Sequence, residues 1–350
     1  MKTLLKVSSV AVAGLLLMGT TSFAKGEKYT LESTKLSSPI TLEANNPAWD
    51  NAKGTNVLLD QTPYKPVGYK GMTKTKAVLK SLYDDKNIYV YLQYNDPTKS
   101  LARFPWVKQV DGSWKQMVNK DKTGHDNTYY EDKVGFFWNI NTRGFAKKGC
   151  GISCHMTKEG KNNGFSDHSA GRKYTRKAGE TIDIWHWKSV RTGLAFDLSH
   201  DQYVDSIADP SSHGWGRHGD EKTGGGYKNN KVKGAKVPTY MSGDSKNMPY
   251  ILDSKKVPFV DTFKAGDEIS GIVVAKMTGS AADVMTSNRY ADGKWTLVFK
   301  RALTTSHPKS KVQDVQFSDL SKPYYFGISV FDNSQINHVY HKGSIKLLFK

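Results

Sequence analysis

The sequence AVLKSLYDDKNIYVYLQY, residues 77–94, gives the clearest indication of the architecture. Aliphatic, aromatic and β-branched residues fill both halves, and the polar run Asp84–Asn87 separates them. Residues of the first kind favour strands, whereas Asp and Asn favour turns. The sequence therefore predicts a β-hairpin that ends at Asn95-Asp96-Pro97.

Short strand patterns recur along the rest of the chain, and helical periodicity is hard to find. The predicted strands are Ile40–Leu42, Asn56–Leu59, Lys133–Ile140, Ile182–Lys188, Ile269–Met277, Trp295–Leu303, Tyr324–Phe331 and Ile345–Phe349. Repeated short strands favour an all-β fold, an antiparallel β-sandwich with long loop insertions, over an all-helical fold.

Two long polar segments interrupt this pattern. Residues 101–130 are expected to form connections over the edge of the sandwich. Residues 199–247 hold few large aliphatic side chains and are expected to form an insertion or lid outside the core. Their His200, His213 and His218 lack the spacing of a metal site, so we expect these imidazoles to be exposed to solvent.

Both cysteines of the chain lie in KKGCGISCHM, residues 147–156, and a histidine follows the second directly. Covalent attachment of haem c requires two thiols for the two vinyl groups and an imidazole for the iron. Cys150, Cys154 and His155 match this requirement, with three residues between the thiols where two are usual. We expect a bulge to absorb the extra residue, with Gly149 and Gly151 supplying the backbone freedom.

Other interpretations of these cysteines are open. A Cys150–Cys154 disulfide is common chemistry in exported proteins, but it gives no reason for the adjacent His155. A structural zinc site needs four thiolates or imidazoles, and the chain has no second cysteine pair. Met156 is the rival to His155 as the proximal iron ligand.

Residues 1–24 are typical of a secretory signal peptide, with Lys2 and Lys6 at a charged start, an apolar run over Val10–Met18 and a cleavage site at Ala24. No segment reaches the roughly 20 apolar residues of a membrane span. We therefore expect one domain, residues 25–350, exported to a bacterial periplasm without a transmembrane anchor.

The net charge of the chain is +18, and it falls to +16 when Lys2 and Lys6 leave with the signal peptide. A basic surface attracts acidic partners. The alternative interpretation of this charge is a lysine-rich surface that is simply solvated. No nucleic-acid-binding motif is present, so nucleic acid is not an expected partner. No catalytic triad, phosphate loop or paired-carboxylate motif is recognisable either, which favours an electron carrier over an enzyme.

The strand pattern IDIWHWK, residues 182–188, places His186 between Trp185 and Trp187. Trp185 and His186 are candidates for the wall of a cofactor pocket. The alternative is an ordinary buried strand whose indoles fill the core.

Taken in order, several motifs resemble the haem-binding subunit family of ethylbenzene dehydrogenase and dimethyl sulfide dehydrogenase. They are Trp49, LYDDKNIYV at 82–90, DIWHWK at 183–188, DGKWTL at 292–297 and FGISVFD at 326–332. The resemblance implies a β-sandwich related to DOMON and carbohydrate-binding modules. It also implies electron transfer from a molybdenum enzyme, through a haem held by methionine and lysine. The cysteine pair departs from that pattern and indicates a c-type branch with one covalently attached haem c.

The resemblance places the second iron ligand in GIVVAKM, residues 271–277. We favour Met277 over Lys276 there, because a thioether binds iron without losing a proton. His186 and His338 remain alternatives.

The leading hypothesis is thus a periplasmic c-type cytochrome that transfers electrons to or from a molybdenum enzyme or another cytochrome. A carbohydrate- or ligand-binding sandwich with a Cys150–Cys154 disulfide is the second. A haem enzyme or gas sensor with an open sixth position is the third.

Overall fold

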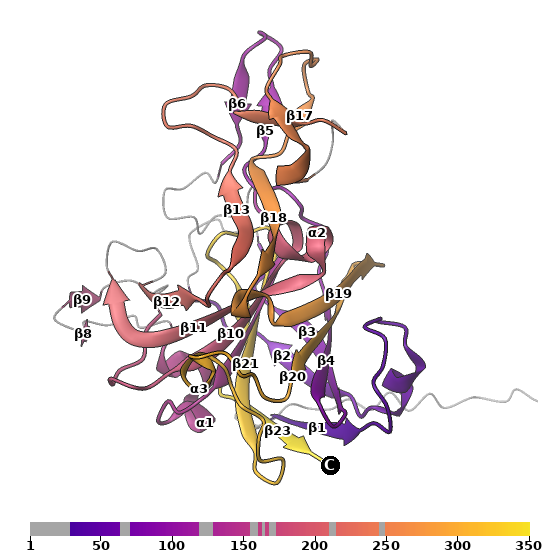
Figure 1. Ribbon diagram of the computed structural model, residues 1–350, viewed down its shortest axis with the longest axis vertical. Coiled ribbons are helices and arrows are strands. Elements are labelled where there is room, and N and C mark those ends of the chain that lie inside the picture. Colours follow the sequence, from indigo (N-terminus) through magenta and orange to yellow (C-terminus); the bar gives the residue numbers. More distant parts are fainter. Residues whose placement is uncertain are drawn as a thin grey trace, which may run out of the picture.

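The computed structural model describes residues 29–63, 71–118, 129–154, 160–162, 165–167, 173–209, 215–244 and 249–350. Figure 1 shows a broad lower body of long strands and a narrower extension that rises from it. Strands dominate, and each described helix is at most five residues long. The all-β prediction is confirmed.

The lower body is one large sheet. Its strands follow in the spatial order β1 (Tyr29–Lys35), β23 (Ile345–Phe349), β21 (Tyr324–Phe331), β7 (Lys133–Asn139), β10 (Ile182–Lys188), β11 (Leu198–Asp209), β19 (Val284–Ala291), β20 (Lys294–Ala302), β4 (Asn87–Asn95), β3 (Thr75–Tyr83) and β2 (Thr55–Leu59). β12 (Trp215–Gly219) pairs with β11, and β22 (Val339–Tyr340) pairs with β21. Because β1 pairs in parallel with both β23 and β3, the sheet closes on itself.

The closed sheet forms two layers that pack face to face, as an antiparallel β-sandwich does. Phe136 of β7 meets Phe299 of β20 with ring centroids 4.9 Å apart, and Trp187 of β10 meets Trp295 of β20 at the same distance. These side chains are buried completely. The aromatic core between the layers therefore fixes the positions of β7 and β10, the strands that carry the candidate site.

The predicted hairpin is β3–β4, which pairs from Ala77 opposite Tyr94 to Tyr83 opposite Ile88. Asp84 explains its turn, because one carboxylate oxygen accepts the backbone N–H groups of Lys86 and Asn87, both at 2.7 Å. Such a side-chain cap is the usual reason for aspartate in a turn.

The extension contains three small sheets with an apolar cluster of its own around Trp106 and Trp114 (Figure 1). They are β17 (Glu268–Ile269) with β5 (Trp106–Lys108) and β6 (Trp114–Gln116); β13 (Gly224–Asn229) with β18 (Ile272–Thr278) and β15 (Ile251–Leu252); and β14 (Tyr240–Ser242) with β16 (Lys256–Pro258). β8 (Gly160–Asn162) and β9 (Phe165–Asp167) pair separately. Residues 101–130 thus include the β5–β6 hairpin as well as connections.

Single helical turns join these strands. They are η1 (Pro47–Asn51), α1 (Phe145–Lys148), η2 (Gly149–Ile152), the π-turn η3 (Ser189–Gly193), α2 (Leu194–Phe196), η4 (Asp253–Lys255), η5 (Ser280–Ala282) and α3 (Ser310–Gln313). In the described part of the chain, no helix has the length and apolar character needed to cross a membrane.

The structure corrects the expected insertion at 199–247. Residues 199–209 belong to β11, which lies between β10 and β19 in the main sheet. Its Asp201 is completely buried, as is Val204. Polar residues on both faces of this strand concealed it in the sequence. Only the later part of the range, from β13 onward, belongs to the extension.

Two predicted strands also differ. Residues 40–42 form no strand; Ile40 and Leu42 instead pack beside Trp49 in a small cluster. The strand expected over 269–277 divides at Gly271 into β17 and β18. A Cβ at Gly271 would lie 1.9 Å from the carbonyl oxygen of Phe104, so the chain passes too close there for any other residue.

Candidate functional site

The cysteine segment forms a helical turn where the sequence predicted a bulge. In η2 and the residues after it, the N–H of Cys154 donates to the carbonyl of Cys150 at 2.8 Å. A bond between residues four apart is that of an α-helical turn, which places both side chains on one side. The three intervening residues therefore bring the thiols onto one face without an excursion of the backbone.

Gly149 is required at the start of this turn, whereas Gly151 is not. Gly149 has φ +59°, and a Cβ there would lie 1.7 Å from the carbonyl oxygen of Gly343. Gly151 has open space around it. The hydroxyl of Ser344 donates to the carbonyl of Ala146 at 2.6 Å, so the β22–β23 connection holds the cysteine segment in place.

Both thiols are free and buried. Burial raises the pKa of each thiol, and the neighbouring Cys154 adds to the effect at Cys150. The thiols are therefore neutral at physiological pH, unlike a thiolate nucleophile or a zinc ligand.

The cysteines lie on the outer face of the sandwich, against alternate residues of β7, β10 and β11. Phe137, Ile182, Ile184 and Val204 form one buried cluster with Cys150 and Cys154. Gly327 of β21 lies beside them, because a Cβ there would meet the Cβ of Cys150 at 3.6 Å. We call this the cysteine face.

Trp185 does not belong to the cysteine face. Side chains alternate along a strand, so Trp185 and Trp187 point into the aromatic core, and His186 points outward. The indoles fill the core, which was the alternative given above, so the structure places Trp185 away from the cysteine face.

His186 lies on the cysteine face. It pairs with Gly135 of β7 on one side and with His200 of β11 on the other. Its Nδ1 lies 2.9 Å from Oε1 of Gln202. An amide oxygen only accepts, so Nδ1 carries the proton and Nε2 keeps its lone pair.

The Nε2 atom of His186 is buried and has no hydrogen-bond partner among the described residues. Burial holds the pKa of His186 well below its ordinary value, and Lys188 and Arg217 lower it further. The ring is therefore a neutral imidazole oriented by Gln202, which is the arrangement found in metal-binding histidines.

Basic side chains surround His186. They are Lys133, Lys188, Arg191 and Arg217, and each lies on the cysteine face or beside it. Arg191 pairs with the buried carboxylate of Glu131. No described carboxylate forms an ion pair with Lys133, Lys188 or Arg217, and burial lowers the pKa of Lys188 to about 8.

An excess of buried positive charge is costly unless an anion balances it. Arg217 stands closest to the imidazole, with Nη1 at 3.3 Å from both Nδ1 of His186 and Oε1 of Gln202. The site is therefore suited to a ligand that combines an apolar body with negative groups.

The remaining predicted ligands are divided between two places. His338 is near the cysteine face: its ring centroid lies 4.5 Å from that of Phe331 in a tilted arrangement, and Phe331 lies 6.3 Å from His186. Met277 and Lys276 lie on β18, in a different sheet, where Met277 is buried and Lys276 is exposed. β18 packs on β13, β15 and η3, whereas η2 packs on α1 and β21. The structure thus brings Cys150, Cys154, His186 and His338 to one face, without Met277 or Lys276.

His155 and Met156 lie outside the described residues, as does His213. His200 was expected to be exposed, but it is buried and its Nδ1 lies 2.9 Å from Nζ of Lys188. Sequence reasoning missed this residue together with Gln202 and Arg217. The signal was present in residues 198–204, where His200, Gln202 and Val204 alternate on one face in the way that a strand requires.

Two solved structures of a carbohydrate binding module family 9 from Caldicellulosiruptor kristjanssonii are similar. The complex with cellotriose has 10% identity and a TM-score of 0.34, and covers 92% of this chain and 94% of that chain. The complex with glucose has 11% identity and the same TM-score, and covers 92% and 96%. At these TM-scores the similarity carries no ligand over to this chain.

No curated protein sequence matches this chain. The family model described as ethylbenzene dehydrogenase matches residues 46–343, which include most of the sandwich and the complete cysteine face. The chain belongs to the ethylbenzene dehydrogenase family.

Proposed function

We propose that this protein is a periplasmic electron-transfer cytochrome with one haem c attached through Cys150 and Cys154. The observation that carries the proposal is the cysteine face itself. It combines two neutral thiols on one side of a helical turn, an oriented imidazole whose buried Nε2 has no described partner, and basic groups that form no ion pair with a described carboxylate. Membership of the family supports a redox role.

The thiols would hold the macrocycle by thioether bonds. Each S–H adds across one vinyl group, so that sulfur gains a carbon and the vinyl group gains the hydrogen. No oxidant is needed. A neutral, buried thiol pair on an apolar floor of Phe137 and Ile184 fits this chemistry better than it fits metal binding by thiolates.

We propose that His155 and His186 would bind the haem iron. His155 follows Cys154 directly, which is the usual place of the proximal histidine. His186 replaces our first choice, Met277, because its free Nε2 lies on the cysteine face and β18 does not. Gln202 fixes the tautomer that leaves this nitrogen available.

Lys133, Lys188 and Arg217 would neutralise the two propionate groups of haem. An apolar ring with two carboxylates is the type of ligand for which the basic, buried surroundings of His186 are suited. When bound, haem supplies one-electron redox chemistry, and the protein adjusts it through ligands, burial and charge. No substrate-transforming residues are required for this role, so the protein acts as a carrier and not as an enzyme.

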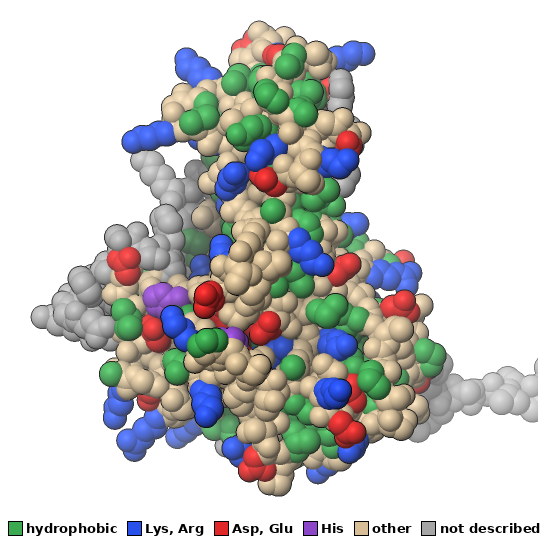
Figure 2. All heavy atoms as spheres, viewed as in Figure 1, with side chains coloured by type: hydrophobic (Ala, Val, Ile, Leu, Met, Phe, Trp, Pro, Cys, Tyr) green, Lys and Arg blue, Asp and Glu red, His purple; other side chains and the backbone are tan. Residues whose placement is uncertain are grey.

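Export and partners are part of the proposal. The signal peptide, residues 1–24, lies outside the described residues, and haem c attachment in a periplasm is consistent with it. The proposed partner is a redox enzyme, such as the molybdenum enzymes associated with this family, or another cytochrome. Figure 2 shows Lys and Arg side chains over much of the visible surface, which favours a partner with an acidic docking face.

The first experiment produces the protein in a periplasm that has haem-attachment machinery. The wild type should be coloured, and its haem should remain with the denatured polypeptide. The double variant Cys150→Ala/Cys154→Ala should lose covalent haem but keep its β-rich circular dichroism, because the aromatic core does not depend on the thiols. A colourless wild-type protein would favour the ligand-binding sandwich with a disulfide instead.

The second experiment compares His186→Ala with Met277→Ala in the holoprotein. His186→Ala should shift the Soret band and change the spin state, because one strong-field ligand is lost. Met277→Ala should leave the spectrum unchanged. His186→Met should introduce the weak near-infrared band of sulfur ligation. If Met277→Ala alone alters the spectrum, the ligand belongs to β18 and our assignment of His186 is wrong.

A further inference from the structure

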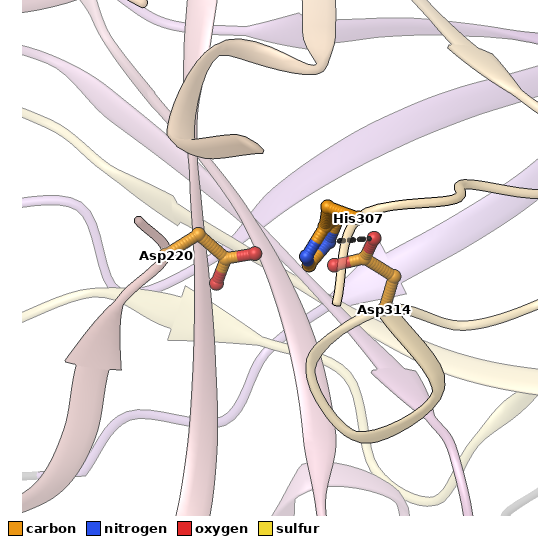
Figure 3. A group of neighbouring side chains, drawn as sticks. All are labelled: Asp220, His307 and Asp314. Carbon is orange, nitrogen blue, oxygen red and sulfur yellow. Dashed lines mark hydrogen bonds and ion pairs between the residues drawn. The ribbon is translucent and has the colours of Figure 1, made fainter. Parts of the chain in front are cut away.

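Three side chains from two separate segments of the chain meet away from the cysteine face. Asp220 follows β12, while His307 and Asp314 stand on the two sides of α3 (Figure 3). Their ligand atoms all lie within 4.8 Å of one another. Figure 3 shows the Asp220 carboxylate pointing toward the imidazole and the Asp314 carboxylate.

Asp220 is the informative member of this group. Its side chain is 97% buried, since its exposed fraction is 3%. Neither of its carboxylate oxygens has a hydrogen-bond partner among the described residues. A buried carboxylate normally accepts several donors, and leaving it without any costs several kcal/mol. Two free oxygens aimed at other ligand atoms therefore indicate a missing positive group.

Asp314 is completely buried and only half satisfied. Its Oδ2 accepts the hydroxyl of Thr305 and lies 2.8 Å from Nε2 of His307, but its Oδ1 has no described partner. The His307–Asp314 contact fixes the imidazole with its nitrogen toward the carboxylates. A metal ion could take the place of the proton that His307 and Asp314 share.

The surroundings increase the negative charge. Asp183, Asp201 and Asp283 all act electrostatically on this group. The nearby cation Arg301 is engaged by Asp183 at 2.7 Å and by the carbonyl of Val315.

We propose that Asp220, His307 and Asp314 bind one divalent cation of the class that accepts both carboxylate and imidazole, such as Mn²⁺ or Zn²⁺. A mixed set of two carboxylates and one imidazole suits these ions better than Mg²⁺. The ion would link the α3 segment to the end of β12 and so close the edge of the sandwich. It is separate from the haem site, because Asp183 and Asp201 lie on the opposite face of β10 and β11 from His186 and Gln202.

The test uses the untagged holoprotein after dialysis against a chelator. Isothermal titration with MnCl₂, ZnCl₂, CaCl₂ and MgCl₂ should show one equivalent of Mn²⁺ or Zn²⁺, a higher melting temperature, and an unchanged Soret band. Asp220→Asn should weaken binding at least tenfold and should still fold, because it removes a charge that has no partner. His307→Ala should weaken binding by a similar factor.

Asp96→Asn is the matched control, since Asp96 is buried in a second acidic group with Asp132 and Asp332. It should leave the affinity for Mn²⁺ and Zn²⁺ unchanged. Absence of binding by all four ions overturns the proposal, as does equal affinity in the wild type and Asp220→Asn. Binding of Ca²⁺ that His307→Ala does not alter would remove the imidazole from the ligand set and overturn the mixed site.

Discussion

The two faces of β10 are both buried, but they differ in chemistry. Toward the core, Trp185 and Trp187 pack in a dense aromatic cluster. Toward the outside, His186 has a free buried nitrogen, and Lys188 has no carboxylate partner among the described residues. The difference teaches that the core face stabilises the fold by aromatic packing, whereas the cysteine face gathers an imidazole and several cations, which is the chemistry that the proposed ligand would use.

The sign of the unbalanced charge differs in the same way. The cysteine face carries an excess of lysine and arginine, while the buried groups around Asp220 and around Asp96 are acidic. An anionic cofactor fits the first, and a cation or a proton fits the second. Neither excess would be expected if these regions served only to stabilise the fold.

The largest expected effect comes from substituting two adjacent residues that lie on opposite faces of β10. Trp185→Ala should lower the free energy of unfolding by about 3–5 kcal/mol, because it opens a cavity in the aromatic core. His186→Ala should lower it by only about 1 kcal/mol in the haem-free protein, since the hydrogen bond between Nδ1 and Gln202 is lost but Nε2 has no described partner to lose. Urea denaturation of both variants without haem measures this. Equal destabilisation would show that the outer face is ordinary core.

Substitution of Gly149 tests whether haem attachment depends on the backbone conformation at the start of the cysteine turn. Gly149→Ala places a side chain at φ +59° and against the carbonyl of Gly343, so the turn must move. The backbone at Gly149, with φ +59° and ψ −148°, lies in a region almost confined to glycine, and holding another residue there costs about 1–3 kcal/mol. The covalent haem content should fall severalfold, whereas the control Gly151→Ala, with open space around it, should keep wild-type content. Haem content is measured from the pyridine haemochrome spectrum.

The acidic group formed by Asp96, Asp132 and Asp332 should make the free energy of unfolding depend on pH. Burial raises the pKa of Asp96, and Asp132 and Asp332 raise it further. The folded state then holds a proton that the unfolded chain releases above pH about 4. The stabilisation by this proton is complete below that pH and is lost as the pH rises toward the folded pKa, at about 1.4 kcal/mol per unit.

Urea denaturation of the protein after removal of metal ions by a chelator, at pH about 5 and about 8, measures how the free energy of unfolding changes with pH. Asp96→Asn should make the slope shallower, because the amide keeps the shape of the side chain and does not titrate. An unchanged slope would mean that Asp96 already carries a counter-ion. The same measurement on Asp220→Asn would then reveal whether the two acidic groups behave alike.

The sequence predicted the sandwich because its strands have strong local patterns. The β3–β4 hairpin and β10 were found with nearly correct bounds, since apolar residues and Asp84 mark them clearly. β11 was missed because its residues face two buried environments that are both polar. A strand with Asp201 on one side and His200 on the other has no apolar alternation to detect.

The candidate site was predictable only in part for the same reason. Cys150 and Cys154 stand out by their spacing and by the histidine that follows. The ligand role proposed for His186 depends on Gln202 and on the row of β7, β10 and β11, which are distant in the sequence. The family pattern pointed to Met277, and only the register of β18 shows that this residue belongs to another sheet.

The smallest expected effect concerns the charge on the cysteine face. Arg217 contacts both His186 and Gln202, so Arg217→Gln removes a positive charge close to the proposed iron ligand. A positive charge favours the reduced form, which carries one more electron, and its loss should lower the midpoint potential. At an effective dielectric constant of about 20, the change is on the order of 1 kcal/mol. For one electron, about 59 mV corresponds to a tenfold change in the equilibrium.

The matched control is Lys76→Gln on the exposed side of β3, which removes the same charge from the solvated surface. Screening by water and salt should leave the potential unchanged in that variant. Spectroelectrochemical titration of the wild type and both variants at one ionic strength separates the local effect from the effect of net charge. Equal shifts of the midpoint potential in both variants would mean that the net charge of the protein sets the potential. The proposed position of Arg217 beside the haem would then be wrong.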